Sequence, residues 1–465
     1  VKICYNRYKE NTYREAMLVK AFKAYDIRGV YNEDFDKEDV YKIGYFLPEL
    51  LAADEVLVGY DDRDSTPEVF EALAEGITDR GADVYKIGYA TTPMVYYGTA
   101  KHDYKASVMI TASHNPPEYN GLKISRENAL PVGYDSGLKE LEEMVENREV
   151  EPVGRKKKGN ILEHDLRDEY IEFQKSYLPD LSELNLSIDV SNGMVAILTD
   201  AIFGDEPHYL YNELDGTFPN HEANPLEAEN REDLKELLLE KGSDLGLIFD
   251  GDGDRVMFLD EKGQFISPDL IIALLAEYYI NQGAGKNVLY DIRTSWSVKE
   301  HIEKLGGKTH MWKVGHAYAK LKLREIDGIC GGELAGHYYY KDFFYCDSGM
   351  LTALVVLNVV ARLKKEGKTI SEYIAELDKY ATSGEVNFKI ENKKEVMEKL
   401  KDHFFEKEEP LNFYDFDGYR LEYNDWWFNV RPSNTEPYLR LVVEAKNQEL
   451  LDEKMEEISE VMDVD

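Results

Sequence analysis

The chain has 465 residues, 43% of them hydrophobic, and its 91 acidic and 55 basic residues give a formal net charge of −36. This length suffices for three or four domains, each with its own core. The acidic excess argues against a nucleic-acid partner, because phosphate backbones would be repelled. The three cysteines, at 4, 330 and 346, form no CxxC pair, and no stretch approaches the roughly 20 apolar residues that span a bilayer. We therefore expect a soluble, cytoplasmic protein with no membrane partner.

The first 16 residues differ from the rest of the chain. They are polar, show no clean periodicity and lack the apolar core of roughly 7 to 15 residues that a secretory signal requires. We interpret residues 1–16 as an N-terminal extension that is not part of the core, with the folded domain beginning near Met17. Deleting this extension should leave turnover and melting temperature nearly unchanged.

Beyond the extension, strand and helix patterns alternate. The apolar runs at residues 55–60, 186–190 and 287–290 each close on an aspartate and precede a helical or mixed segment. Such alternation predicts α/β units with mainly parallel sheets covered by helices. The end of the chain differs, with strand patterns at 386–390, 419–423, 426–430 and 438–443 and helices expected at 392–404 and 447–462. The last domain is therefore predicted to be α+β.

Breaks in composition place the domain boundaries. A charged segment at 147–160, a turn at 260–263 and Thr382-Ser383-Gly384 separate the parts. We predict domain 1 at 17–155, domain 2 at 156–262, domain 3 at 263–382 and domain 4 at 383–465.

A serine follows the apolar run Ala106–Ile110 in the segment Thr-Ala-Ser-His-Asn-Pro, residues 111–116. Ligands of open α/β sheets bind outside the carboxyl ends of the strands, so Ser113 can present its oxygen, facing solvent, to a reacting group. The plainer interpretation is a turn serine beside an Asn-Pro pair.

Three carboxylates follow a second buried-strand pattern, Leu245–Phe249. They lie in Asp-Gly-Asp-Gly-Asp-Arg, residues 250–255, where the alternating glycines let the backbone fold Asp250, Asp252 and Asp254 toward one centre. An acidic surface turn is the alternative. An EF-hand is excluded because Arg255 stands where its loop needs glycine and the flanks read as strands. Together, the serine and the aspartates suggest phosphoryl transfer assisted by a divalent cation.

Two further loops carry polar groups. Gly-Gly-Glu-Leu-Ala-Gly-His, residues 331–337, brings Glu333 and His337 together on flexible glycines, which suits a polyhydroxylated ligand. Arg-Pro-Ser-Asn-Thr-Glu-Pro, residues 431–437, joins two expected strands and gathers donors that form a phosphate clamp. A glycine-rich turn and an ordinary hairpin are the corresponding structural alternatives.

Four motifs in order, TASHNPPEYNGLKI at 111–124, DGDGDR at 250–255, GGELAGH at 331–337 and RPSNTEP at 431–437, resemble the α-D-phosphohexomutase superfamily. The resemblance covers the chain from about Met17 to its end. YDIRG at 25–29, FPNHEANPL at 218–226 and Asn434 are most similar to the phosphomannomutase/phosphoglucomutase branch. The resemblance implies three similar α/β domains with mixed or parallel sheets and a C-terminal α+β domain around a central cleft.

It also implies an activity. Phosphorylated Ser113 would exchange its phosphoryl group with a hexose 1-phosphate or 6-phosphate of mannose or glucose, through a 1,6-bisphosphate that also serves as activator. One Mg²⁺ per chain would be held by Ser113, Asp250, Asp252 and Asp254. Lys123 matches the general acid/base, with a pKa expected to be lowered by neighbouring positive charge.

The resemblance further implies roles for individual residues. Arg28 and Arg255 would stabilise phosphoryl charge, and His114 is counted with the catalytic residues. The substrate-binding set comprises Tyr25, Arg293, His316, Glu333, His337, Arg431, Ser433, Asn434 and Thr435. We expect a monomer or weak homodimer whose ligands are hexose phosphates.

Two positions depart from the family pattern. Arg293 stands where close relatives carry lysine, and we expect a fork in place of a point charge to change how the distal phosphate is held. Ala335 stands where many relatives carry serine, which leaves the sugar preference open. A phosphoglucosamine mutase, a phosphatase and a non-catalytic sugar-phosphate-binding homologue stay as alternatives.

Overall fold

The structure, a computed structural model, describes residues 21–433 and 438–463. These residues form two compact units. The first contains the chain up to Ile266 together with Ala335–Ile370, and the second contains Ser267–Leu334 and the chain from Ser371 onward. The expected extension at residues 1–16 lies outside the described residues, and the four domain boundaries stay predictions.

The first unit opens with a seven-stranded mixed sheet in the order β1-β5-β4-β2-β3-β7, with β6 paired to β5. The parallel strands β2, β3 and β4 lie beside the antiparallel pairs β4–β5 and β1–β5. Its strands are β1 (Ile27–Val30), β2 (Glu55–Tyr60), β3 (Asp83–Tyr89), β4 (Ala106–Ile110), β5 (Tyr119–Arg126), β6 (Leu130–Pro131) and β7 (Ile161–Glu163).

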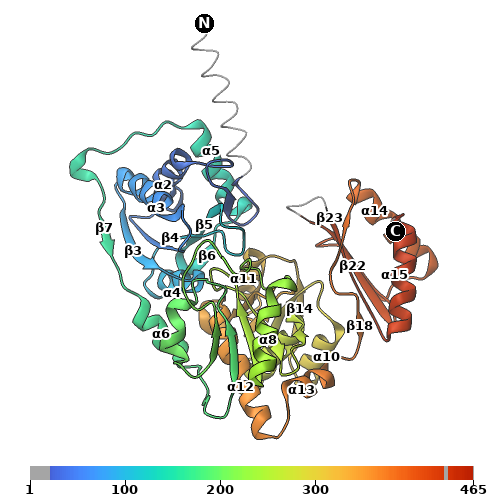
Figure 1. The fold of residues 1–465 in the computed structure, drawn as a ribbon. Helices are drawn as coiled ribbons and strands as arrows, with labels where there is room; N and C mark the ends of the chain where they lie inside the picture. The colour runs from blue at the N-terminus through green and yellow to red at the C-terminus, as the bar shows by residue number, and fades with distance from the viewer. Residues whose placement is uncertain (1–20, 434–437, 464–465) are drawn as a thin grey trace. The chain divides into compact units, whose positions relative to one another are not determined.

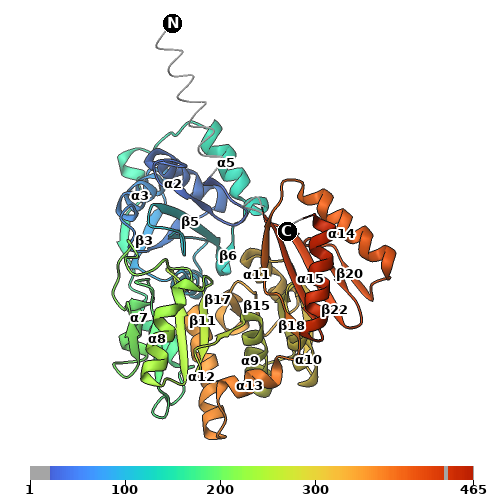
Figure 2. The same ribbon diagram turned by 45° about the vertical axis from the view of Figure 1, so that its right-hand side comes forward.

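Local sequence explains the helices of this sheet. Helix α2 (Lys37–Leu51) begins with a capping box in which Asp36 and Asp39 satisfy free amides. Helix α3 (Thr66–Arg80) has a proline in its first turn and Gly81 as its C-cap. The two lie side by side in both views (Figures 1 and 2). Their apolar faces join the strands in one core that includes Ile43, Leu73 and Val108. The remaining helices are α4 (Thr92–Lys101), α5 (Leu138–Asn147) and α6 (Arg167–Lys175).

The second sheet of the first unit has five strands in the order β12-β11-β10-β8-β9. Here β10 pairs parallel with β8 and antiparallel with β11, so this sheet is mixed as well. Its elements are β8 (Leu186–Asp189), α7 (Ala196–Ile202), β9 (His208–Leu210), α8 (Glu232–Lys241), β10 (Leu245–Phe249), β11 (Val256–Asp260) and β12 (Phe265–Ile266). The hairpin β16 (Tyr338–Tyr340) with β17 (Cys346–Asp347) and the apolar helix α12 (Gly349–Lys365) complete the unit.

The second unit combines a parallel ladder with an antiparallel sheet. In the ladder, β13 (Asn287–Asp291) lies between β14 (Lys308–Trp312) and β15 (Cys330–Gly332). Its helices are α9 (Pro268–Asn281), α10 (Trp296–Lys304), α11 (His316–Glu325) and, after the excursion to the first unit, α13 (Ile370–Leu377).

The antiparallel sheet has the order β18-β23-β22-β21-β20, with β19 also paired to β23. Helices α14 (Lys393–Lys407) and α15 (Gln448–Met462) cover one face of it (Figure 2), where Leu400, Phe428 and Ile458 share a core. The strands are β18 (Ala381–Thr382), β19 (Val386–Lys389), β20 (Asn412–Tyr414), β21 (Tyr419–Glu422), β22 (Trp426–Pro432) and β23 (Tyr438–Ala445).

The predicted α/β segments and the α+β final segment are thus confirmed, with mixed sheets. Among the described residues, no helix has both the length and the apolar character needed to cross a membrane.

Candidate active site

Ser113 follows β4 directly and adopts the left-handed backbone conformation, with φ of 53°. A non-glycine residue rarely adopts this conformation, and such strain clusters at functional sites. The hydroxyl donates to Asp250 Oδ2 at 2.9 Å and lies 3.2 Å from Nδ1 of His114. Ser113 is only 1% exposed, so the expectation of a solvent-facing hydroxyl is wrong. The aspartate loop covers it.

Arg63, which was not predicted from the sequence, donates hydrogen bonds to the backbone of the serine loop. This buried guanidinium donates to the backbone carbonyls of Ser113 at 2.9 Å and Asn115 at 2.7 Å, and also to those of Pro116 and Tyr119. Its Nε donates to Asp61 at 3.1 Å. The sequence signal is Asp61, which directly follows β2, with Arg63 two residues later; β2 is the parallel neighbour of β4, which the serine loop follows.

The three aspartates converge as the glycine pattern predicts. Asp250, Asp252 and Asp254 are all buried, and one carboxylate oxygen from each lies within 4.8 Å of the other two. Gly251 lets this loop approach the serine loop, because a Cβ there would lie 2.6 Å from the carbonyl oxygen of Ser113. One oxygen each of Asp252 and Asp254 is buried without a hydrogen-bond partner. Hard carboxylate oxygens in this arrangement fit Mg²⁺.

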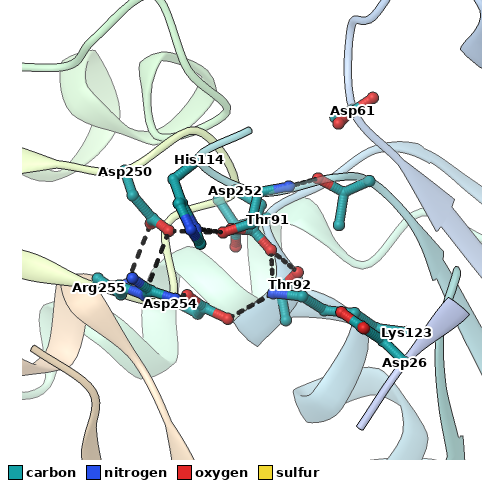
Figure 3. A network of polar contacts seen from close by, with 12 residues as sticks. Asp26, Asp61, Thr91, Thr92, His114, Lys123, Asp250, Asp252, Asp254 and Arg255 are labelled. Carbon is teal, nitrogen blue, oxygen red and sulfur yellow. Dashed lines mark hydrogen bonds and ion pairs between the residues drawn. The ribbon is translucent and has the colours of Figure 1, made fainter. Parts of the chain in front are cut away.

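Lys123, from β5, lies between two of these carboxylates (Figure 3). Its Nζ is 2.5 Å from Asp252 Oδ2 and 2.6 Å from Asp254 Oδ2. Burial alone would lower the pKa of Lys123, but the two aspartates outweigh burial and raise it. The expectation that positive neighbours lower this pKa is therefore wrong here, because the negative neighbours are closer. The lysine is buried and charged, not solvated.

The aspartates themselves differ in electrostatic environment. Burial, together with the charges of Asp254 and Asp252, raises the pKa of Asp250 well above its ordinary value. Burial opposes ionisation of Asp254 too, but Lys123 and His337 hold its pKa well below the usual range. Asp254 is therefore ionised, and the neighbouring cations balance the negative charge of the aspartate cluster.

The other predicted catalytic residues lie around this cluster. Arg28 donates to Asn115 Oδ1 at 2.8 Å and pairs with Asp26, while Nε of Arg255 lies 3.9 Å from carboxylate oxygens of both Asp250 and Asp254. Burial and the neighbouring cations lower the pKa of His114 well below its ordinary value, so the imidazole is neutral near pH 7. The structure thus brings these residues together with Ser113.

His337 belongs to the same cluster. Its Nε2 lies 3.2 Å from Arg255 Nε, 3.4 Å from Asp254 Oδ1 and 3.9 Å from Asp347 Oδ2. An antiparallel bridge between Arg255 and His337 fixes this contact through the backbone. Glu333, from the same motif, belongs to the second unit, and its expected proximity to His337 stays a prediction. Asp347, fully buried, was not predicted because it ends a two-residue strand with no motif of its own.

In the second unit, the guanidinium of Arg293 forms ion pairs with two carboxylates. It pairs with Asp291 and Glu385, each at 2.7 Å, and only 5% of it is exposed. Two carboxylates contact its guanidinium, and the expected effect of the fork on how the distal phosphate is held stays a prediction. Burial raises the pKa of Glu385, but Arg293, Arg440 and Arg431 more than offset this and lower it. Glu385, which was not predicted, thus interacts electrostatically with three arginines.

Glu333 is 2% exposed and accepts from the amide of Gly315, directly before His316 at the start of α11. The glycines before it were expected in a flexible loop, but Gly331 and Gly332 belong to β15 and pair with β13. Gly331 is needed there for close packing, because a Cβ on it would lie 2.7 Å from that of Leu289.

The predicted phosphate clamp begins within a strand. Arg431 in β22 lies opposite Arg440 in the neighbouring strand β23. Its Nε lies 3.4 Å from Asp417, which also accepts from the amide of Val314. Ser433 is buried, and its carbonyl accepts from Lys393. Asn434 and Thr435 lie outside the described residues. Tyr25, in the first unit, is half-buried.

Four family models match the chain in order. They describe phosphoglucomutase/phosphomannomutase α/β/α domain I at residues 19–151, domain II at 168–263, domain III at 267–380 and the C-terminal domain at 385–461. Together they span most of the chain, so the resemblance is not restricted to the motifs.

Curated relatives and solved structures agree. A phosphomannomutase of Escherichia coli strain K12 is 37% identical over 436 residues, covering 91% of this chain and 94% of the relative. A phosphomannomutase of Methanocaldococcus jannaschii is 35% identical over 447 residues, covering 95% and 97%. The crystal structure of a phosphoglucomutase/phosphomannomutase family protein from Burkholderia thailandensis has a TM-score of 0.85 at 30% identity, covering 95% of this chain and 97% of that one. Since models and relatives cover nearly the whole chain, the protein belongs to the phosphoglucomutase/phosphomannomutase family of enzymes.

Proposed function

We propose that this protein interconverts hexose 1-phosphate and hexose 6-phosphate, of mannose, glucose or both, through a phosphoserine at Ser113 and a 1,6-bisphosphate intermediate. The observation that carries the proposal is the hydroxyl of Ser113, held on a strained strand-end backbone 2.9 Å from Asp250 of the three-aspartate cluster. A nucleophile beside a cation-binding set is the arrangement that phosphoryl transfer needs.

Asp250, Asp252 and Asp254 would hold Mg²⁺, since their oxygens converge and two of them lack hydrogen-bond partners. Bound there, Mg²⁺ would neutralise charge on the phosphoryl group that leaves or rejoins the serine oxygen. Activity should therefore be lost on chelation with EDTA and restored by added magnesium chloride.

Each transfer conserves atoms and protons. The bond between phosphorus and Ser113 Oγ breaks as a sugar hydroxyl oxygen bonds to phosphorus; the sugar loses a proton and the serine gains one. His114, neutral and 3.2 Å from Oγ, can accept or return that proton. Lys123 enters as a charged proton donor, and Arg28 and Arg255 stabilise phosphoryl charge.

The second unit would bind the rest of the substrate. Glu333 accepts from sugar hydroxyls, while His316, Arg431 and Ser433 grip the phosphate that is not reacting. Mannose and glucose differ only at the 2-hydroxyl, and Glu333 reads hydroxyls that the two sugars share. We therefore propose dual specificity.

A coupled assay that offers mannose 1-phosphate and glucose 1-phosphate, each with a trace of the bisphosphate, tests the proposal. Wild type should turn over both, and Ser113→Ala should lose at least about a thousandfold, or about 4 kcal/mol of transition-state stabilisation. The matched control is Ser191→Ala, because Ser191 also follows a buried strand with a left-handed backbone, φ of 54°, but donates to the carbonyl of Phe249. It should stay within about tenfold of wild type. Full turnover by Ser113→Ala would exclude the phosphoserine route.

A further inference from the structure

A cavity of about 680 Å³ lies within the second unit. Its walls come from β14 and α10 on one side and from the β20–β21 region on the other. None of the residues assigned to hexose phosphates, Arg293, His316, Glu333, Arg431 and Ser433, lines it. The cavity is therefore a feature that the mutase reaction leaves unused, and its volume is that of a site for a small molecule.

Aromatic side chains dominate the walls. Seven of the seventeen lining residues are aromatic, compared with 12% of the chain as a whole. Trp296 and Tyr380 meet edge to face with centroids 5.6 Å apart, and Tyr414 meets Phe416 in the same way at 6.1 Å. Such rings offer flat apolar surfaces that can cover the CH face of a ring-shaped ligand.

The charges on the walls are already neutralised. Lys322 pairs with Glu325 at 2.7 Å, Glu300 with Lys379 at 2.8 Å, and Glu422 with Arg420 at 2.8 Å. Burial and the nearby Lys322 and Lys308 lower the pKa of His310, which is therefore neutral at pH 7. A phosphorylated or otherwise ionic ligand would find no excess of opposite charge here.

What remains is a set of groups that suit hydroxyls. Asn412, Asn424 and Thr309 line the cavity with amide and hydroxyl groups, and the carboxylate of Glu300, which accepts from Lys379 and Tyr380, keeps acceptor capacity. Hydroxyls both donate and accept, so a polyhydroxylated ring can satisfy such a surface while its CH face contacts the aromatic rings. We infer that this cavity is an accessory site for a neutral saccharide, separate from the site that takes hexose phosphates.

The strand β20 supplies matched variants. Asn412 and Tyr414 line the cavity, whereas Phe413 between them does not; its ring packs against Phe405 and Tyr419 instead. Alternate residues of a strand point to opposite faces. Tyr414→Ala and Asn412→Ala therefore remove an aromatic wall and a polar partner of the cavity, and Phe413→Ala is the control on the opposite face.

Intrinsic fluorescence provides the readout, because two of the four tryptophans of the chain, Trp296 and Trp312, line the cavity. The full chain is titrated with glucose, mannose and maltose, with sorbitol as an acyclic control. We expect a saturable change with a midpoint around 1 mM, equivalent to about −4 kcal/mol, for at least one cyclic sugar and not for sorbitol. The midpoint should rise at least about tenfold in Tyr414→Ala and Asn412→Ala and stay within about twofold in Phe413→Ala.

Two results would overturn the inference. One is the absence of any saturable change up to about 100 mM sugar, well above the range of a specific site. The other is a change that Tyr414→Ala and Asn412→Ala both retain unaltered, which would place the sugar elsewhere, including the hexose-phosphate site. Circular dichroism establishes that each variant is folded. Because the readout is binding, failure here leaves the mutase proposal untouched.

Discussion

Arg63 offers the sharpest test of how the serine loop is built. Its guanidinium is 1% exposed and donates to four backbone carbonyls and to Asp61. Arg63→Met keeps most of the apolar stem but removes every donor, which leaves Asp61 and the four carbonyls without that partner. Breaking a buried charge pair from one side costs about 3–5 kcal/mol.

The loss should be local before it is global, since the carbonyls belong to one loop. Hydrogen–deuterium exchange of peptides covering residues 111–121 therefore follows it directly. A loss of about 3–5 kcal/mol corresponds to a rise in the opening constant of about a hundredfold to a few thousandfold. Turnover should fall with it, because Ser113 is no longer held on its left-handed backbone.

Arg148→Met is the control, because Arg148 pairs with Glu49 at the surface, where its side chain is 44% exposed. Such a pair contributes about 1 kcal/mol or less. Removing it should leave exchange at 111–121 unchanged. If Arg63→Met changed that exchange by less than about fivefold, or about 1 kcal/mol, the reasoning that Arg63 supports the serine loop would be refuted.

Three further predictions concern the second unit. Burial raises the pKa of Glu444 to about 7 from 4.5, so the folded state holds a proton that the unfolded state loses, and stability should fall by up to about 3 kcal/mol as pH rises from 4.5 to 7. Glu444→Gln should flatten the plot of melting temperature against pH over this range, and an unchanged slope would contradict the prediction. Arg293→Lys should lower stability by about 2 kcal/mol in thermal melts, because a lysine ammonium cannot bridge Asp291 and Glu385 as the planar guanidinium does. An unaltered melting temperature would show that the guanidinium is not needed for stability. Arg431→Ala should raise KM and lower kcat by similar factors for both hexose phosphates, since the clamp contacts the phosphate and not the sugar. For the wild type, kcat/KM for the two sugars should differ by less than about a thousandfold, about 4 kcal/mol. A larger ratio would mean that a residue contacts the 2-hydroxyl.

Much of the fold could be predicted because its signals are local. The apolar runs at 55–60, 106–110 and 245–249 are β2, β4 and β10 with the same ends, and the helices expected at 392–404 and 447–462 are α14 and α15 to within three residues. The exception is the expectation of mainly parallel sheets, because the antiparallel neighbours β5 and β11 make both sheets of the first unit mixed.

The site was predicted where a motif carries it and missed where distant segments meet. Ser113 and the aspartates stand out by composition, but Arg63 and Glu385 act on residues 50 and 92 positions away. Charge balance also depends on tertiary distance. Lys123 was expected among cations, yet the two carboxylates nearest its Nζ decide its pKa.

The most direct test of the account is transfer of phosphate through Ser113 itself. The purified protein is incubated with glucose 1,6-bisphosphate and magnesium, freed of small molecules, and analysed by peptide mass spectrometry before and after addition of mannose 1-phosphate. We predict one phosphate on the peptide that contains Ser113, lost on addition of mannose 1-phosphate as mannose 1,6-bisphosphate appears. A protein that stays unphosphorylated while it catalyses the interconversion, or a phosphate on another residue that transfers to the sugar, would contradict the central claim.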